Sequence, residues 1–397
     1  MKISEINLQE TPDAVRLSAK LDDFELWYKL PAGWPASARG DAFLPPALVV
    51  SMVRDKPPEI TSDAPISPQL RLGCEQIQHV LHGWDPSFRY ATIQTGEKLS
   101  EPGHPGVASF FSGGLDSSYT FLRHAEEITH LILVRGSDIS LADDRVFTAA
   151  VRHGEKVARA FGKTLVVAET NSLELGVRRG VRRWTYFGAT LAGVALALGF
   201  RKVYVAGGQN YGSLWAAGSH LLLDRHWSTE TTTFIHDGVE ARRSDKLRAI
   251  AGSRVLLDGL RVCLRRGNYN CGRCEKCLRT MIPIRLLGCS SPTLPLLASA
   301  APLRAIRLRD DAEFSYCREN YELALDVGDA EIAGALLSLM RGYIVRKTVL
   351  DFDKFFCGGR LARAYRILRG RDPAGHEPNR QLGGSRRPAQ PRPGRNP

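Results

Sequence analysis

Residues 107–206 alternate short apolar runs with longer amphipathic stretches, and this rhythm limits the possible folds more than any other feature. The runs predict four strands (Val107–Phe111, His130–Val134, Thr164–Ala168 and Lys202–Ala206), and the stretches between them predict three helices (Ser117–Glu127, Arg145–Phe161 and Trp184–Gly199). Strands separated by helices of this length indicate βαβ crossovers. We therefore expect an α/β fold, a doubly wound parallel sheet covered on both faces, with its site at the carboxyl ends of the strands.

The regions on either side follow other patterns. Residues 1–100 contain alternating runs at Ala14–Leu21 and Phe24–Leu30 and a predicted helix at Ser67–Trp84. The Pro/Gly-rich segment Glu101–Gly106 marks a boundary, and from about residue 291 the pattern is helical without an evident site, most clearly at Ala330–Lys347. We expect four parts: a small N-terminal α+β domain (1–100), the α/β domain (107–288), a helical C-terminal region (291–357) and a basic tail (358–397) that is disordered at its end.

The formal net charge of +12 is concentrated in that tail. Residues 358–397 hold ten arginines, no lysine and only Asp372 and Glu377, whereas the remaining residues carry 44 basic and 40 acidic side chains. The charge therefore indicates a basic tail and local anion sites rather than a nucleic-acid footprint. A nucleic-acid partner stays open but is not favoured.

The sequence also indicates a cytoplasmic protein with no membrane partner. Glu5 interrupts the apolar stretch that a signal peptide would need near the N-terminus. The most apolar run, Tyr186–Phe200, is shorter than the ~20 residues of a bilayer span and predicts a buried helix. Four of the eight cysteines crowd together near residue 270, which favours a metal site over a set of disulfides.

The segment Phe111–Ser118, with the sequence FSGGLDSS, lies between a predicted strand and a predicted helix. Its two glycines let the backbone approach an anion, the helix start offers free N–H groups, and three serines add hydroxyl donors. A carboxylate would repel phosphates unless a divalent cation lay between them, so we assign Asp116 as a Mg²⁺ ligand. The other interpretation is a Ser/Gly turn that only caps the helix.

Ser112–Ser117 resembles the SGGxDS loop of the PP-loop ATP pyrophosphatases of the N-type. The resemblance implies a Rossmann-like fold of the adenine nucleotide alpha hydrolase kind, ATP and Mg²⁺, and cleavage between the α- and β-phosphates. It implies nucleotide contacts from the loop, and, by order along the chain, from the ends of the second and fourth strands. The residues are Ser112, Gly113, Gly114, Leu115, Asp116, Ser117, Ser118, Val134, Gly136, Gly207 and Gly208.

A second motif follows the α/β pattern: C-x₇-C-x₂-C-x₂-C, formed by Cys263, Cys271, Cys274 and Cys277. A predicted strand at Leu260–Leu264 and a turn-rich segment can bring four thiolates around one Zn²⁺, with Arg273, Lys276 and Arg279 offsetting its negative charge. An iron–sulfur cluster stays open as the competing interpretation. The matching ferredoxin run would continue x₃-C-P, but Met281 stands at that cysteine position.

Together the two motifs resemble the 7-cyano-7-deazaguanine synthase-like proteins over residues 107–288. This resemblance implies a structural zinc and an enzyme that activates a carboxylate with ATP for attack by ammonia. It also implies a catalytic lysine that faces the phosphates, and Lys246 stands in the matching place. A solvated helix lysine is the other interpretation of Lys246.

Two segments are candidates for an acceptor site. Four arginines between Arg178 and Arg183 can bind a phosphate or carboxylate, or simply start a basic helix in solvent. Residues Asp224–Glu230, with His226, contain acid/base groups that are equally compatible with a polar loop. The remaining cysteines have no recognisable nucleophile context, which argues against sulfur transfer: Cys74, Cys289, Cys317 and Cys357.

We therefore expect an ATP-dependent ligase that adenylates a small-molecule carboxylate for attack by ammonia, giving an amide or a nitrile. A thiolase that modifies tRNA or nucleotides, using the same adenylation with an iron–sulfur cluster, is the second hypothesis. A non-catalytic module that binds ATP and zinc is the third.

Overall fold

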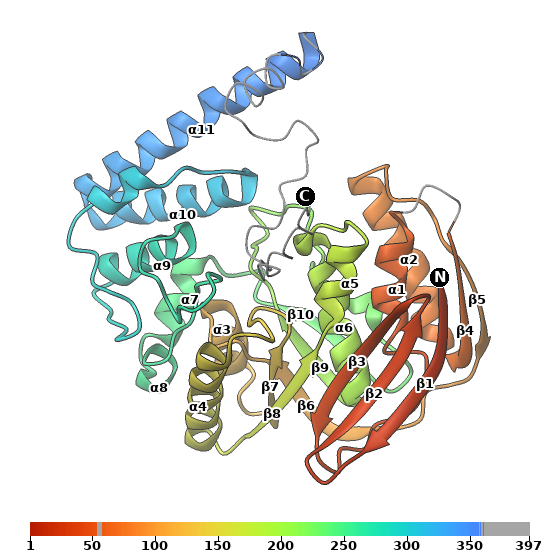
Figure 1. Cartoon of the computed structure of the whole chain (residues 1–397). Helices are drawn as coiled ribbons and strands as arrows, with labels where there is room; N and C mark the ends of the chain where they lie inside the picture. Colours follow the sequence, from red (N-terminus) through yellow and green to blue (C-terminus); the bar gives the residue numbers. More distant parts are fainter. Residues whose placement is uncertain (54–57, 357, 359, 361–397) are drawn as a thin grey trace, which may run out of the picture. The chain divides into compact units, whose positions relative to one another are not determined.

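The computed structural model describes residues 1–53, 58–356, 358 and 360 (Figure 1). Contacts divide the chain into two units, Met1–Arg341 and Gly342–Pro397. The first unit contains the sheet and the candidate site. The second contains, of the described residues, the end of helix α11 (Ala330–Phe356). Apart from residues 358 and 360, the predicted basic tail and Cys357 lie outside the described residues.

Ten strands of the described residues form one mostly parallel sheet in the order β10-β9-β6-β7-β8-β3-β2-β1-β4-β5. Neighbours run parallel from β10 to β8 and from β1 to β5, and the pairs in between are antiparallel. The strands are β1 (Lys2–Glu10), β2 (Ala14–Leu21), β3 (Phe24–Pro31), β4 (Glu59–Ile66), β5 (Thr92–Glu97), β6 (His104–Phe110), β7 (His130–Arg135), β8 (Thr164–Thr170), β9 (Phe200–Ala206) and β10 (Thr233–Asp237).

The four strands predicted from apolar runs are confirmed as β6, β7, β8 and β9, and the two alternating runs near the N-terminus form β2 and β3. Strands β1, β4, β5 and β10 were not predicted. The predicted strand at Leu260–Leu264 is wrong: this segment forms no regular strand, although its backbone bonds to the loop after β6. Asn270 instead binds the N–H groups of Val262 and Cys263, which takes the donors that a sheet partner would need.

The strands of residues 1–97 extend the same sheet. Strand β3 pairs antiparallel with β8, where Tyr28 lies opposite Thr170 and Lys29 opposite Glu169. One hydrophobic cluster contains buried side chains from β1 to β3 together with those of β6 to β10. The predicted boundary segment at residues 101–106 overlaps β6, which begins at His104, so residues 104–106 belong to the sheet.

Helices cover both faces of the α/β part (Figure 1). On one face, α4 (Asp144–Ala160) packs its Val146 and Ala150 against Leu133 of β7. The neighbouring residues Ile132 and Val134 point to the opposite face and join the cluster that contains α6. This alternation confirms a sheet buried on both sides, as parallel sheets require.

The helices follow local signals. The predicted helix at Ser67–Trp84 is α2 (Pro68–Trp84), which starts where the Ser67 hydroxyl accepts the N–H of Leu70. The apolar run at residues 186–200 is mostly α6 (Arg183–Leu198), which ends at Gly199 in the left-handed conformation. The others are α1 (Leu44–Ser51), α3 (Leu115–Arg123), α5 (Ser172–Arg178), α7 (Arg243–Ile250), α8 (Arg254–Leu257), α9 (Glu275–Leu286), α10 (Asp311–Val327) and the 3-10 turns η1 (Asp224–Trp227) and η2 (Ala301–Ala305).

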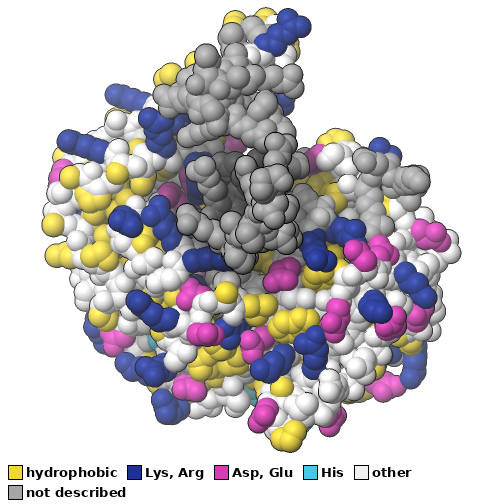
Figure 2. All heavy atoms as spheres, in the orientation of Figure 1, with side chains coloured by type: hydrophobic (Ala, Val, Ile, Leu, Met, Phe, Trp, Pro, Cys, Tyr) yellow, Lys and Arg dark blue, Asp and Glu magenta, His cyan; other side chains and the backbone are white. Residues whose placement is uncertain are grey.

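In the part of the chain that the structure describes, no helix has the length and apolarity needed to cross a membrane. Lys and Arg side chains are interspersed with Asp and Glu over the face shown in Figure 2. This distribution agrees with the near balance of charge outside the tail.

Gly193 tests how tightly the N-terminal strands join the core. A Cβ added at Gly193 of α6 would lie 2.2 Å from the buried Tyr28 hydroxyl, which donates to Ala42 O. We expect Gly193→Ala to lower the free energy of unfolding by about 2 kcal/mol, because neither partner can retreat. The measurement is denaturant unfolding of the full chain. The matched control is Gly83→Ala in α2, which meets no atom within 4 Å and should stabilise by about 0.5 kcal/mol. Equal effects of the two changes would contradict this packing.

Candidate functional site

The sheet has a topological switch point between β6 and β9. The chain moves from β6 to β7 and β8 on one side, while β9 lies on the other side of β6. At such a point the connections leave in opposite directions and open a crevice outside the carboxyl ends of the strands. A cavity of about 540 Å³ lies here, lined by the ends of β6, β7 and β9 and by parts of α6, α9 and α10.

The loop at residues 112–118 forms one end of this cavity. Gly113 has φ of 73°, and a Cβ there would lie 3.2 Å from the His153 ring, so this position requires glycine. The Ser112 hydroxyl accepts the N–H of Gly114 at 3.3 Å and lies 3.3 Å from the Ser117 hydroxyl. Of the predicted loop residues, those lining the cavity are Ser112, Gly114, Leu115, Asp116 and Ser117.

The loop therefore has the polar lining that was predicted, with two exceptions. Gly113 and Ser118 lie behind the cavity wall. Ser118 is fully buried.

Two cations meet at Asp116. Lys246 Nζ lies 3.2 Å from one carboxylate oxygen, and Arg243 Nη1 lies 2.5 Å from the other. Burial alone would raise the pKa of the Asp116 carboxyl, but Arg243 and Lys246 outweigh burial and hold this pKa well below its usual range. Asp116 is therefore a carboxylate at every physiological pH.

Lys246 is not a solvated lysine. Its side chain is 1% exposed, and its ammonium also donates to Gly207 O at 2.6 Å. It lies behind Asp116, whereas Arg243 lines the cavity itself. Asp116 needs no divalent cation for its charge to be balanced, because Arg243 and Lys246 already balance it. A Mg²⁺ ion at Asp116 would share this carboxylate with the two side chains or compete with them for it.

Of the four nucleotide contacts predicted at the ends of β7 and β9, two line the cavity and two do not. Val134 and Gly208 line the cavity. Gly136 instead has φ of 92° and packs so closely on β8 that a Cβ would lie 1.7 Å from Thr170 O. Gly207 contributes its carbonyl to Lys246 rather than to the cavity.

No sequence pattern indicated the opposite wall of the cavity, which comes from α9 and from α10 of the helical C-terminal region. Tyr316 of α10 donates to Gly208 O at 2.8 Å, and Arg279 of α9 lies 3.9 Å from the centre of its ring. The carboxylate of Glu319 accepts from Asn210, in the loop after β9. Helix α10 thereby forms part of the cavity wall. Residues 309–313, which lie just before the helix and in its first turn, also line the cavity.

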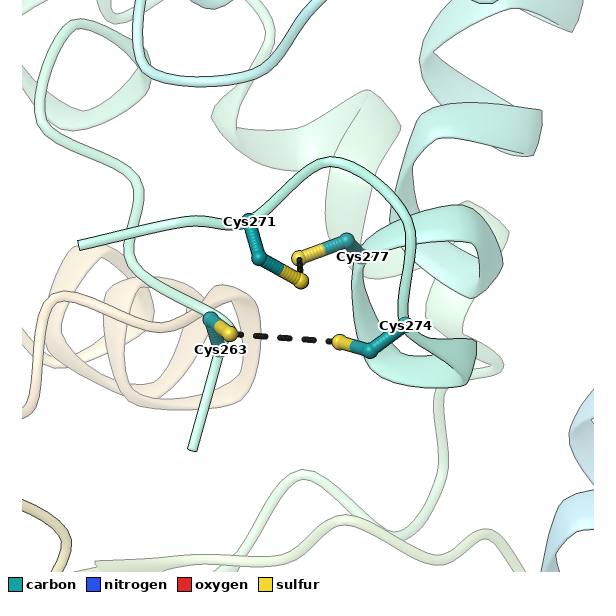
Figure 3. A group of neighbouring side chains, drawn as sticks. All are labelled: Cys263, Cys271, Cys274 and Cys277. Atoms are coloured by element: carbon teal, nitrogen blue, oxygen red, sulfur yellow. Dashed lines mark hydrogen bonds between the residues drawn. The ribbon is translucent and has the colours of Figure 1, made fainter. Parts of the chain in front are cut away.

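The four cysteines of the predicted metal motif lie together (Figure 3). Their sulfur atoms are all within 4.8 Å of one another, with 3.9 Å between Cys263 and Cys274 and between Cys271 and Cys277. Metal–sulfur bonds of about 2.3 Å in a tetrahedron place sulfurs about 3.8 Å apart. The cluster can therefore hold a single metal ion such as zinc.

These short distances suit one ion better than a [4Fe–4S] cluster, in which each thiolate binds a different iron. The cations expected around the thiolates are arranged differently. Arg273 is exposed, while Lys276 and Arg279 line the cavity. Lys276 Nζ lies 4.8 Å from the centre of the Trp184 ring, and burial together with Arg279 lowers the pKa of this lysine to about 8.

The two predicted acceptor segments do not line the cavity. Arg179 pairs with Asp23, and Arg183 with Ser137 O at 2.9 Å, so these arginines have structural partners. Asp224 accepts from the Ser219 hydroxyl and from the N–H of His220, and it lies 2.6 Å from His236 Nδ1.

The rest of the 224–230 segment fixes helix α2. Glu230 accepts the N–H groups of Gln69 and Ser100, and the His226 carbonyl lies against Gly73. A role for His226 in acid/base chemistry has no support from its position, since it is not among the residues lining this cavity.

Comparison of the chain with protein-family models, with curated proteins and with solved structures found no match. The class that the fold and site define is thus an α/β protein with a cavity at a switch point and, beside it, a four-cysteine cluster that could hold a metal ion. The resemblance to PP-loop pyrophosphatases stays a prediction.

The cysteine cluster should bind one metal ion per chain. We expect elemental analysis of anaerobically purified protein to find about one equivalent of zinc or iron, because four thiolates fill a tetrahedral site. Cys271→Ser should lower that content severalfold. Cys289→Ser, outside the cluster, is the control and should leave the content unchanged. Full metal content in the Cys271 variant would contradict a four-thiolate site.

His153, whose ring packs against Gly113, should make the free energy of unfolding depend on pH. Its ring is 8% exposed; burial, then Lys156, lower its pKa to about 4, against a smaller opposite effect of Asp258. Because the folded value lies below the unfolded one, stability is full above pH about 6.5 and falls as the pH drops towards 4.

The loss should reach up to about 3 kcal/mol. His153→Gln should flatten this part of the pH profile of thermal or urea unfolding. The exposed His79→Gln is the control. An unchanged slope in the His153 variant would show that this ring does not carry the effect.

Proposed function

We propose that the chain is an ATP-dependent ligase of the PP-loop pyrophosphatase class, with a Rossmann-like nucleotide fold, that forms AMP and pyrophosphate. Its acceptor would be a small-molecule carboxylate, adenylated for attack by ammonia to give an amide or a nitrile. The observation that carries the proposal is the meeting of an SGGLDS loop, a paired Asp116 and two cations at the switch-point cavity. A glycine turn that merely capped a helix would not need this convergence.

In the proposed reaction a carboxylate oxygen of the acceptor attacks the α-phosphorus of ATP. The bond from the α-phosphorus to the bridging oxygen breaks, and pyrophosphate leaves. Ammonia then attacks the acyl carbon, AMP leaves with the former carboxylate oxygen, and the nitrogen loses a proton to give the amide. A nitrile requires removal of the amide oxygen in a second activation by ATP.

The chain's own residues would contribute binding and charge. The free N–H groups at the start of α3 and the hydroxyls of Ser112 and Ser117 line the cavity and can bind phosphate oxygens. Arg243 adds a cation on the wall, and Lys246 holds Asp116 from behind. Such preorganised donors stabilise the charge that develops as pyrophosphate leaves.

Mg²⁺ bound with the nucleotide would neutralise phosphate charge. Asp116 is the loop carboxylate that could bind this ion, in competition with Arg243 and Lys246. We propose zinc for the cysteine cluster, where the short sulfur–sulfur distances support a single structural ion. None of the cysteines among the described residues lines the cavity. This favours nitrogen over sulfur transfer, because a thiolase commonly needs a thiol beside the acceptor.

Asp116→Asn should lower pyrophosphate release from ATP, measured across small carboxylates with ammonia, by about 10²–10³-fold. Ser117→Ala, which leaves both ion pairs intact, should weaken ATP binding by about tenfold through one lost donor to a charged group. Thermal unfolding of both variants checks that they fold.

The matched control is Arg248→Gln, a change of an exposed cation on the same helix as Lys246. It should release pyrophosphate at the wild-type rate. Wild-type protein that binds ATP without any turnover would favour the non-catalytic module. Iron in the cluster with release stimulated by tRNA would favour the thiolase.

A further inference from the structure

The segment Gly259–Cys263 connects the cysteine cluster to the phosphate loop. Arg261 is 5% exposed and binds two consecutive loop carbonyls: its backbone N–H donates to Gly113 O at 2.8 Å, and its Nε to Ser112 O at 3.2 Å. A backbone donor and a charged side-chain donor from one residue, bound to neighbouring carbonyls, restrict the dihedral angles of a glycine loop. Arg261 therefore helps to set the conformation in which the loop presents its N–H groups.

The same arginine reaches the cysteine cluster. Its Nη1 lies 3.5 Å from the carbonyl of Cys263, two residues further along the chain. The carboxylate of Asp138 lies 3.9 Å from its Nη2. A shift of Cys263 would consequently move the backbone from which Arg261 extends.

Asn270, the residue before Cys271, holds the segment from the other side. Its side-chain oxygen accepts the N–H groups of Val262 and Cys263 at 2.9 and 3.2 Å, and its amide donates to Leu260 O at 2.7 Å. Asn270 thus ties the backbone on either side of Arg261 to the residue that precedes Cys271. Bonds from one metal ion to Cys263 and Cys271 would close this arrangement covalently.

Close packing leaves the segment little freedom to adapt. A Cβ at Gly259 would lie 1.9 Å from His153 Nδ1, and Tyr269 donates to the Gly259 carbonyl at 2.7 Å. His153 in turn lies beneath Gly113 of the loop. A displacement of the backbone at the cluster would therefore also displace the loop, because the residues between them are closely packed.

We propose that Arg261 is a positioning residue that transmits metal occupancy of the cysteine cluster to residues 112–118. Loss of the metal loosens the loop and weakens its binding of phosphate groups. The coupling rests on the proposed function only where it concerns the nucleotide. The effect on the loop itself exists without any ligand.

Hydrogen exchange of the full chain without nucleotide tests the proposal directly. We expect removal of Zn²⁺ by a chelator to speed exchange of the amides in residues 112–118 by about tenfold or more, with strands β1–β3 unchanged. Arg261→Gln, with its metal content still equal to wild type, should show the same acceleration. Adding Zn²⁺ back should restore the chelated wild type but not the variant.

Arg266→Gln is the matched control, because Arg266 is an exposed arginine in the same connection. It should exchange like wild type in both metal states. The proposal is overturned if the metal-loaded Arg261 variant keeps wild-type exchange in the loop. It is also overturned if metal removal leaves the loop unchanged or loosens β1–β3 equally.

ATP binding by calorimetry, measured separately on the same proteins, keeps the two proposals apart. Loosening of the loop in a protein that never binds ATP would refute the proposed function and leave the coupling intact. ATP binding that is insensitive to both metal and Arg261 would refute the effect of the coupling on nucleotide binding and leave the proposed function intact.

Discussion

The buried ammonium of Lys246 is the constraint on which the site depends. A charge that is 1% exposed has to be paired, since an isolated buried ion costs several kcal/mol. Lys246 satisfies this need with Asp116 at the start of α3 and with the carbonyl of Gly207 after β9. Three segments that are far apart in sequence are thereby held at one point: the loop at residues 112–118, the end of β9 and α7.

The alternation of apolar runs was sufficient to predict the central strands, because a strand buried on both faces must be apolar at nearly every position. It was insufficient for β10, where Thr233 and His236 break the run. It also could not show that β3 would pair with β8. Antiparallel pairing between distant strands depends on which edges remain open once the sheet has formed, and no local pattern records that.

The residues of the candidate site also fall into those that a local sequence pattern indicates and those that only the fold brings together. The loop and the four cysteines were visible in the sequence because their chemistry needs fixed spacing over a few residues. Tyr316 and Arg243 were not, because an aromatic ring or an arginine on a helix is ordinary until the fold places it on a cavity wall. For the charged segments around residues 180 and 226 the sequence left a site and a structural role open. Neither segment lines the cavity, and Arg179 and Glu230 have structural partners.

The contact between Tyr316 and Gly208 has a consequence for biosynthesis. The two residues are 108 positions apart, and the loop near residue 112 lies a further hundred residues upstream. Contacts of such long sequence separation form only after both partners have been synthesised and the loop between them has closed. A ribosome-bound chain that has folded its sheet would still present an open crevice, and the complete cavity would be available only after α10 has emerged from the ribosome.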